Sequence, residues 1–459
     1  MLNLIKNEYI KIFKRGSMLA AALILFVLSF AIIAITVVGY SYMEEEMYYV
    51  SDGEMELGSK EYYEYRIESL KIELEDLNNG ADSSNYQPKE VLENAVKMYQ
   101  FIIDNELFNE KDWRVEAAYN LFNGTYNEEE KEFQDIKKTL ESNDFEGYVR
   151  TKAEQTKRDK IEYINCEDGI ENIYQYMVDK EIFDANDWRY EALTNLEILA
   201  GGARTDAEIL RVKALNYQIL NDIRYATTDI NTEFYDEEQL ESSMFMNVFG
   251  ASPSVMIILC GIIIIFAGII VATEHTTGTI KFLITNPVSR GKIIVSKYIT
   301  IISLAAIGML LLFGFNLVAS MILCGAEGMD AAHLKVTMDG ITQSTMIGNT
   351  FIKYCLEMVG VIAYGTMAFA ISSFAKSTSV AVAAGIMCAM SGSIASQLLA
   401  QLHQDWGRYL IFSNTSLSTI YSGGSYYPNQ SITFAITTVV IYVVIFFVIA
   451  YDGFTRREV

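Results

Sequence analysis

The segment ATEHTTGTIKFLITNPVSRGKIIVSKY, residues 272–298, lies between two long apolar stretches and decides how the chain is oriented. Its charged residues are Lys281, Arg290, Lys292 and Lys297 against the single acidic residue Glu274. An excess of lysine and arginine in a short loop between apolar segments is typical of the cytoplasmic side of a membrane. The segment therefore predicts a polytopic membrane protein with this loop in the cytoplasm.

Six apolar stretches are each long enough to cross the hydrocarbon core of a bilayer as a helix. They are residues 16–40, 253–273, 298–324, 351–373, 378–402 and 432–451. With six crossings, the basic groups near both chain ends fall on the same side as the 274–297 loop, so we expect both termini in the cytoplasm. The expected fold class is all-α, and the expected location is the plasma membrane of a bacterium.

The count of six spans also predicts on which side of the membrane each connecting segment lies. Residues 41–250 and 325–350 are expected outside, 403–431 as an extracellular or re-entrant segment, and 452–459 as a cytoplasmic tail. Residues 1–15 place Ile5, Tyr9, Ile12 and Phe13 on one helical face. This pattern predicts an amphipathic helix in the membrane interface, with packing on protein as the alternative.

The acidity of the chain belongs to the insert between the first two spans. Between Met43 and Phe245 the chain carries 49 acidic and 21 basic residues, while the remainder carries 9 acidic and 14 basic residues. An acidic surface repels phosphate backbones, and no run rich in lysine and arginine is present, so nucleic-acid binding is not expected. Few glycines and one proline, Pro88, predict a mostly helical insert.

An internal repeat lies within the insert. Residues 99–121 recur as residues 174–196, with twelve identical positions at an offset of 75. Each copy predicts helix, short turn and helix, with Asn109 or Asp184 as the N-cap of the second helix. Around the repeat, residues 63–77 have the apolar spacing of a packed helix, and a weaker series spans 209–223. These two series form either a stalk or part of a helical core.

Two interpretations fit the Asp-Trp-Arg triplet of each repeat. Trp113, Arg114, Trp188 and Arg189 are candidate extracellular recognition residues, because tryptophan and arginine dominate binding hot spots. A corner that packs in the same way twice also requires the same residues twice. We favour the packing interpretation and keep the recognition site as the alternative.

The sequence contains no recognisable nucleotide-binding, metal-binding or nucleophile motif. The nearest string to a phosphate-binding loop, residues 289–293, has neither the first glycine nor the final hydroxyl residue. His-Glu-x-x-His, paired-cysteine and Gly-x-Ser-x-Gly patterns do not occur. The sequence therefore predicts no catalytic, cofactor-binding or metal-binding residue, and a chain that is not itself an enzyme.

One apolar span carries a polar face. Ser393, Gln397 and Gln401 are spaced four residues apart in the 378–402 span. Lipid cannot satisfy their hydrogen-bonding groups, so they must face protein or water. Hydrogen bonding at a subunit interface and a lining of the translocation path explain them equally well.

The 272–298 segment resembles the first cytoplasmic loop of ABC transporter permeases of the type-2 exporter class. In that family an acidic residue ends the second span, followed by Thr-Gly-Thr, a short helix, Pro-x-Ser-Arg and a lysine that enters the third span. Here these are Glu274, 277–279, 280–284, 287–290, and Lys292 with Lys297. Residues 7–11 are similar to the elbow helix of the family. The resemblance covers a little over half of the chain, and the acidic insert departs from compact members.

The resemblance implies a permease subunit that has no ATPase of its own. It implies a separate ABC ATPase as partner, which binds ATP and Mg, and a second permease copy in a homodimer or heterodimer within the lipid bilayer. The ATPase-coupling residues that it implies are Glu274, Thr276, Thr277, Gly278, Thr279, Ile280, Lys281, Phe282, Leu283 and Arg290. Spans 253–273 and 378–402 are implied to line the route of an exported substrate, for which a peptide or an amphipathic antimicrobial is a candidate.

A function from a different class also fits the sequence. In this alternative the chain is a membrane-anchored sensor or interaction protein, and the acidic helical insert binds an external partner. The spans then act only as a scaffold.

Overall fold

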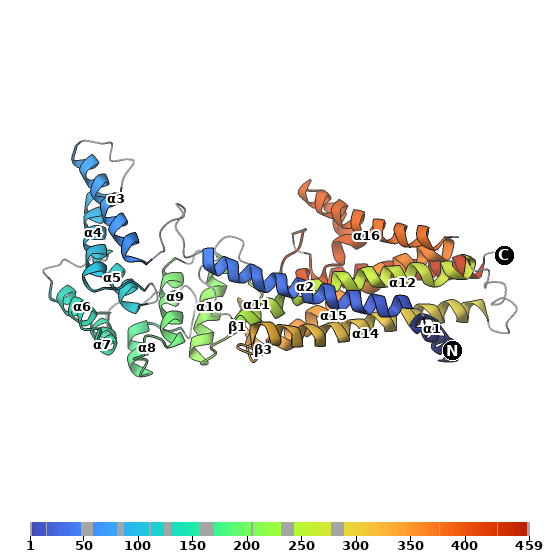
Figure 1. The fold of residues 1–459 in the computed structure, drawn as a ribbon, viewed down its shortest axis with the longest axis horizontal. Coiled ribbons are helices and arrows are strands. Elements are labelled where there is room, and N and C mark those ends of the chain that lie inside the picture. Colours follow the sequence, from blue (N-terminus) through green and yellow to red (C-terminus); the bar gives the residue numbers. More distant parts are fainter. Residues whose placement is uncertain are drawn as a thin grey trace. The chain divides into compact units, whose positions relative to one another are not determined.

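The computed structural model describes most of the chain in two compact units. The described residues are 2–14, 16–46, 58–79, 87–109, 112–123, 130–156, 169–202, 205–230, 243–276, 289–375, 377–428 and 430–456. Unit 1 comprises Met1–Val38 and Tyr225–Val459, and unit 2 comprises Gly39–Arg224. Figure 1 shows the elements of both units along the chain.

Unit 1 is a bundle of long helices. Its helices are α1 (Leu2–Phe13), α2 (Gly16–Glu46), α11 (Met244–Ala251), α12 (Met256–Thr276), α14 (Arg290–Cys324), α15 (Met346–Phe374), α16 (Thr378–Gln401), α17 (Leu417–Tyr421) and α18 (Ile432–Thr455). Among the described residues, six helical segments are long and apolar enough to cross a membrane: Met18–Ser41, Met244–Glu274, Arg290–Cys324, Met346–Phe374, Thr378–Gln401 and Ile432–Thr455. The predicted all-α polytopic membrane fold is confirmed.

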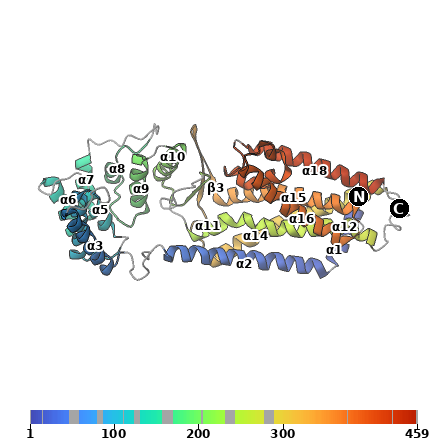
Figure 2. The ribbon, with the colours of Figure 1, turned by 90° about the horizontal axis from the view of Figure 1, so that it is seen from above.

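Helix α15 is the centre of the bundle and packs against α12, α14, α16 and α18 (Figure 2). Small residues allow the close approaches: a Cβ added at Gly385 would lie 3.2 Å from Cβ of Ala368. A buried polar chain also crosses the bundle. Ser29 donates to Asn316 at 2.5 Å, Asn316 donates to Tyr354 at 2.6 Å, and Tyr354 donates to the carbonyl of Ser252 at 3.1 Å. These groups satisfy one another where lipid offers no partner.

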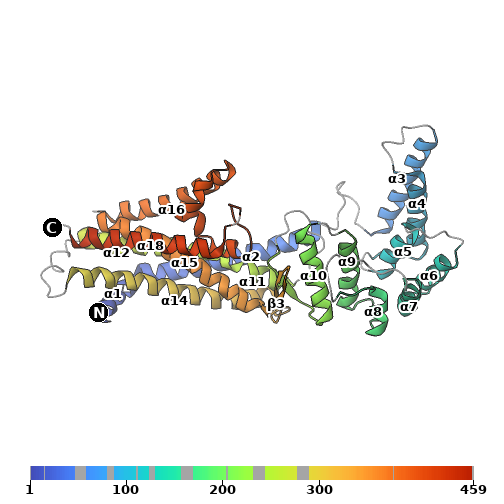
Figure 3. The same cartoon turned by 180° about the vertical axis from the view of Figure 1, so that it is seen from behind.

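A small sheet interrupts the helical pattern. The strands β1 (Ala226–Thr228), β2 (Ala332–Thr337) and β3 (Gly340–Thr345) form a sheet in that order, with β1 parallel and β3 antiparallel to β2. The predicted loop 325–350 therefore contains a hairpin and the start of α15. Within unit 1 the sheet lies at one end of the bundle, and both chain termini lie at the other (Figure 3).

Residues 405–421, within the segment predicted as extracellular or re-entrant (403–431), pack against the helices of the bundle, and the location of this segment relative to the membrane stays a prediction. The segment consists of the 3-10 turns η4 (Asp405–Tyr409) and η5 (Ile411–Asn414), followed by α17. Asn414 is fully buried, and its amide donates to the carbonyls of Arg408 and Leu410. The segment packs on α15, α16 and α18. These three helices cover much of the non-helical backbone of the segment with protein.

Unit 2 contains α3 (Lys60–Asn78), α4 (Lys89–Asp104), α5 (Trp113–Asn123), α6 (Lys131–Glu141), α7 (Phe145–Gln155), α8 (Ile173–Asp179), α9 (Trp188–Gly202) and α10 (Asp206–Leu220). Helix α3 buries Tyr63, Ile67 and Leu70 and packs on α4, while α10 packs on α9. The two apolar series flanking the repeat therefore take part in core packing.

The repeat has the same structure in both copies. The first helix of each copy ends in a left-handed residue, Glu106 with φ 52° and Glu181 with φ 55°. The second helix begins at the tryptophan, and the carboxylate of the preceding Asp112 accepts the backbone N–H of Arg114 at 3.0 Å. The expected N-caps at Asn109 and Asp184 are thus wrong, because the second helices begin only at Trp113 and Trp188.

Candidate functional site

The strongest cluster of charge in unit 1 lies where α1, α12 and α14 meet. Helix α12 ends at Thr276 and α14 begins at Arg290. The eight residues 290–297 are therefore helical rather than part of the predicted 274–297 loop. The apolar series that follows Lys292 continues into the predicted 298–324 span, so one helix includes both. Residues 277–288 lie outside the described part of the chain.

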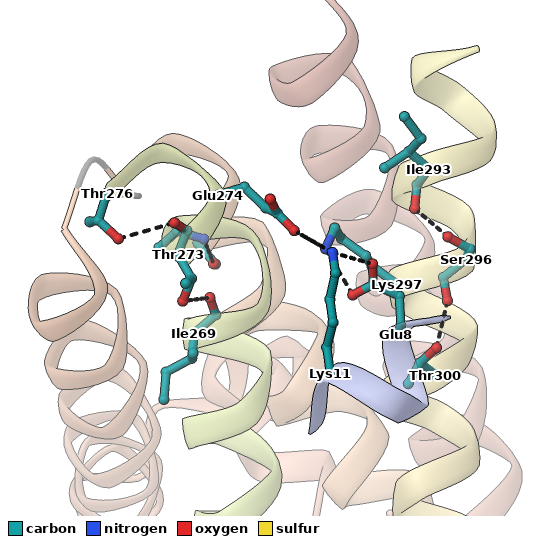
Figure 4. Close-up of polar contacts among 12 residues, drawn as sticks. Glu8, Lys11, Ile269, Thr273, Glu274, Thr276, Ile293, Ser296, Lys297 and Thr300 are labelled. Carbon is teal, nitrogen blue, oxygen red and sulfur yellow. Dashed lines mark hydrogen bonds and ion pairs between the residues drawn. The ribbon is translucent and has the colours of Figure 1, made fainter. Parts of the chain in front are cut away.

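Lys297 is the centre of the cluster (Figure 4). Its side chain is 1% exposed, and its Nζ lies 2.9 Å from Oε2 of Glu8 and 3.0 Å from Oε1 of Glu274. Both carboxylate side chains are 9% exposed. One buried ammonium group therefore joins the N-terminal helix to the end of α12 and the start of α14.

Lys11 completes the cluster from the solvent side. Its Nζ lies 3.2 Å from Oε1 of Glu8 and 3.0 Å from Oε1 of Glu274, and its side chain is 47% exposed. Burial works against the charged form of Lys11, but the carboxylates of Glu8 and Glu274 outweigh it, so the pKa of Lys11 lies above its ordinary value. Two carboxylates and two ammonium groups thus balance one another, and we call these four residues the charged junction.

The helices around the charged junction satisfy their own polar groups. On α14, the hydroxyls of Ser296 and Thr300 donate to the backbone carbonyls of Ile293 and Ser296 at 2.7 Å and 2.9 Å. A second anchor lies on α1, where the hydroxyl of Tyr9 donates to that of Ser303 at 2.5 Å. These bonds hold the polar groups of α14 next to the junction and join α1 to α14 at a second point.

Such a junction is sensitive to the loss of one member. Taking charges out of water is unfavourable, and their mutual attraction offsets this only while every partner is present. Removal of one partner from a buried ion pair typically destabilises a protein by about 3–5 kcal/mol. The junction therefore acts as a rigid link between α1 and the two helices that flank residues 277–288.

The predicted coupling residues are only partly within this site. Glu274 is a member of the junction, and Thr276 donates to the carbonyl of Thr273 at 3.1 Å. Arg290 lies at the start of α14, and its guanidinium donates to the carbonyl of Thr455 at 3.4 Å. The expectations for Thr277, Gly278, Thr279, Ile280, Lys281, Phe282 and Leu283 fall outside the described residues.

Sequence reasoning missed Glu8 and Lys11 as members of the site. The sequence did carry a signal, because Glu8 is a charged residue beside the apolar face of an amphipathic helix. The structure shows that this side is covered, since Glu8 is 7% exposed. Periodicity alone does not reveal which distant charge satisfies it. The partner of Glu8 is separated from it by 289 positions in the chain.

The other predicted residues lie away from the charged junction. Ser393, Gln397 and Gln401 are exposed along α16 within this single chain, and Gln397 donates to the hydroxyl of Tyr426 at 2.9 Å. Their polar face is thus largely uncovered by the described residues of the same chain. This is compatible with either a second subunit or an aqueous path beside α16.

The tryptophans of unit 2 form part of packed corners. Trp113 is 9% exposed, its ring lies 5.0 Å from that of Phe145, and its indole N–H donates to Asn143 at 3.2 Å. Arg114 pairs with Asp112 at 2.6 Å. These contacts support the packing interpretation for the first copy.

The second copy repeats the Asp–Arg pair but differs from the first in two respects. Arg189 pairs with Asp187 at 2.6 Å, as Arg114 does with Asp112, and also lies 3.7 Å from Asp222. Trp188 is only partly buried.

Within the described ranges of the chain, no three or more His, Cys, Asp or Glu side chains gather closely enough to hold a metal ion.

Comparison with known proteins places the chain in a family. Residues 215–459 match the family described as "Protein of unknown function (DUF2705)". "Uncharacterized protein YhcI" from Bacillus subtilis (strain 168) is 33% identical over 199 residues, which cover 43% of this chain and 63% of that protein. "Uncharacterized membrane protein YdbK" from the same organism is 26% identical over 216 residues, which cover 47% of this chain and 83% of that protein. The match thus spans less than two thirds of the first relative.

The family match includes α12, α14, α15, α16 and α18, together with Glu274 and Lys297 of the charged junction. It covers more than half of the chain, whereas most of unit 2 lies outside it. The protein therefore belongs to the DUF2705 family, with six helices suited to a membrane and an additional helical unit between the first two of them.

Proposed function

We propose that the chain is the permease subunit of an ATP-driven ABC exporter. The observation that carries the proposal is the burial of Lys297 between Glu8 and Glu274, 2.9 Å and 3.0 Å away. This contact links the amphipathic N-terminal helix to both ends of residues 277–288, the segment whose sequence resembles an ATPase-coupling loop. A force applied to that segment is therefore transmitted to three helices at once.

The proposed mechanism requires two conformations of the bundle. A partner ATPase selects between them when it binds the 277–288 segment more tightly in one conformation than in the other. Phe282 and Leu283 supply an apolar anchor for the ATPase, and Lys281 supplies a charge. Because the charged junction holds α1, α12 and α14 together, these helices move as one body rather than separately.

The topology that belongs to this proposal follows the distribution of basic residues. Both termini, the 277–288 segment and the charged junction lie on the cytoplasmic side, and unit 2 lies outside. The uncovered polar face of α16, formed by Ser393, Gln397 and Gln401, then faces the route or the second permease copy. The acidic insert favours a cationic substrate, for which a basic or amphipathic peptide is the candidate class.

The proposal is tested by purification of the full chain together with the ABC ATPase encoded nearest to it. The wild-type chain should bring the ATPase with it in an approximately equimolar complex. A chain carrying Phe282→Asp and Leu283→Asp should be inserted in the membrane normally and lose the ATPase. Equal recovery of the ATPase with both chains would contradict the assignment of the contact to this loop.

A second candidate function rests on unit 2, which is a compact unit of its own. In this function, the insert binds an external partner and the bundle serves as an anchor. The two proposals differ in the effect of the loop substitutions on a binding partner of unit 2. An anchored sensor keeps that binding and never retains an ATPase.

A further inference from the structure

Glu357 lies in the interior of a membrane-suited helix. At about 1.5 Å per residue, it is about 16 Å along the α15 axis from Met346 and about 25 Å from Phe374. The 29 residues of α15 make it about 43 Å long, which exceeds the thickness of a hydrocarbon core, about 30 Å, so a core centred on the helix would hold Glu357 about 10 Å inside its nearer edge. Ionisable residues at such positions are rare and usually functional.

Glu357 has no basic partner in the described part of the chain. No lysine, arginine or histidine nitrogen of those residues lies within the 4.0 Å limit of an ion pair to its carboxylate. The nearest basic residue on the same helix, Lys353, is paired with Asp229 at 3.2 Å. The contact of Glu357 is with Ser418 of α17, whose hydroxyl donates to Oε1.

The surroundings of Glu357 connect α15 to segment 405–421. Seven residues further along α15, the hydroxyl of Tyr364 lies 3.0 Å from that of Thr415. Between these positions, Gly360 leaves room for the backbone of the segment, because an added Cβ would lie 2.6 Å from the carbonyl oxygen of Thr415. The titratable groups that face Glu357 are the thiol of Cys260 on α12 and the phenol of Tyr364.

These contacts depend on the charge of the carboxyl group. As a carboxylate, Glu357 accepts a charge-assisted hydrogen bond from Ser418, which is stronger than a bond between neutral groups. Glu357 is partly buried, and partial burial without a basic partner among the described residues opposes the carboxylate, whereas a bound proton removes the charge. Protonation therefore exchanges a strong contact to α17 for a weaker one.

We propose that Glu357 is a proton-binding site within the bundle, and that proton binding loosens the attachment of segment 405–421 to α15. The site requires only residues of this chain, so it does not rest on a partner ATPase. It adds a proton to the ligands of the protein and gives segment 405–421 two states.

The first test uses the full-length protein in lipid nanodiscs with N,N′-dicyclohexylcarbodiimide, an apolar reagent that modifies protonated carboxyl groups in membranes. Mass spectrometry should find the adduct on Glu357, with a yield that falls about tenfold per pH unit above its apparent pKa. The exposed Glu327 serves as the internal control, because it should react with a water-soluble carbodiimide instead. No adduct on Glu357 between about pH 5 and about pH 9, or a yield that is independent of pH, would overturn the proton site.

Two substitutions, one on α17 and one at the residue that follows it, make the test specific. Ser418→Ala removes the donor that stabilises the carboxylate, so the pH of half-maximal labelling should move upward. Ser422→Ala, one turn away, should leave it unchanged. Equal profiles for the two variants would contradict the assigned contact.

Hydrogen exchange tests the loosening itself. The amides of residues 417–421 should exchange faster at acidic pH, once the intrinsic pH dependence is corrected. Glu357→Gln, which imitates the protonated group, should show the faster exchange already at neutral pH. If neither acid nor Glu357→Gln changes the protection of α17, the proposed control of the segment is wrong.

Discussion

The Nζ of Lys297 lies 2.9 Å from Oε2 of Glu8, although 289 positions separate them in the chain. The contact holds the N-terminal helix against the start of α14, and Glu274 extends it to the end of α12. Because Lys297 is 1% exposed, water does not replace a missing partner easily. The junction is therefore the first place to test the structure of unit 1.

Lys297→Met should destabilise the bundle by about 3–5 kcal/mol, since the carboxylates of Glu8 and Glu274 lose their buried partner. Lys11 remains beside both and limits the effect toward the lower value. Thermal unfolding of the purified protein in nanodiscs measures the change. In the double variant with Glu8→Gln, the second substitution should cost less than it does alone, and strict additivity would refute the direct contact.

Gly360→Ala should displace segment 405–421, because the new Cβ would lie 2.6 Å from the carbonyl oxygen of Thr415. Such overpacking typically costs about 1–3 kcal/mol. Gly314→Ala on α14 is the matched control, since no atom lies within 4 Å of its added Cβ. Thermal unfolding should separate the two variants, and equal stability would argue against the close contact of α15 with the segment.

Glu116→Gln should stabilise unit 2 at neutral pH. Burial raises the pKa of Glu116, and the carboxylates of Glu197 and Glu191 raise it further. Between the ordinary glutamate value of about 4.3 and the higher folded value, the folded chain binds more protons than the unfolded chain. Stability therefore falls as pH rises through that window and stays lower at neutral pH.

The measurement is the midpoint of thermal unfolding of the full chain as a function of pH. Glu116→Gln should raise the midpoint at neutral pH, by about 2–4 °C for each kcal/mol, and lose this advantage in acid. Glu154→Gln on the exposed face of α7 should have no effect. A lower midpoint for Glu116→Gln at neutral pH would contradict the buried repulsion.

Asp229 should make the sheet of unit 1 sensitive to acid. Burial tends to raise the pKa of Asp229, but the hydrogen bond with His333 and the charge of Lys353 outweigh it, so the pKa lies below its ordinary value. The stabilisation is present above the unfolded value of about 3.9 and is lost as pH falls through the lower folded value. Hydrogen exchange at β1 should increase in this range, and Asp229→Asn should abolish the increase.

The six spans could be predicted because each depends on local composition, which hydropathy and length report directly. The repeat of unit 2 was equally visible, and its two corners have the same left-handed residue at Glu106 and Glu181. The β1–β2 pairing could not be predicted in the same way. It joins Ala226 to Ala332, and such a register is fixed by tertiary contacts rather than by local pattern.

Two of the four residues of the charged junction could be singled out from the sequence, because they lie close together in it. Glu274 and Lys297 belong to one short basic segment, so both attracted attention as part of a loop. Glu8 and Lys11 lie on a helix whose amphipathic pattern explains its location but not its ionic partners. Long-range pairing of charges requires the fold before it can be recognised.

Under the proposed function, residues 277–288 transmit the work of a separate ATPase to the bundle. ATP hydrolysis by the ABC ATPase encoded nearest to this chain, reconstituted with it in nanodiscs, tests this claim most directly. The account predicts that the wild-type chain stimulates hydrolysis and that the Phe282→Asp and Leu283→Asp chain, although folded and inserted, does not. Equal hydrolysis with both chains would contradict the account.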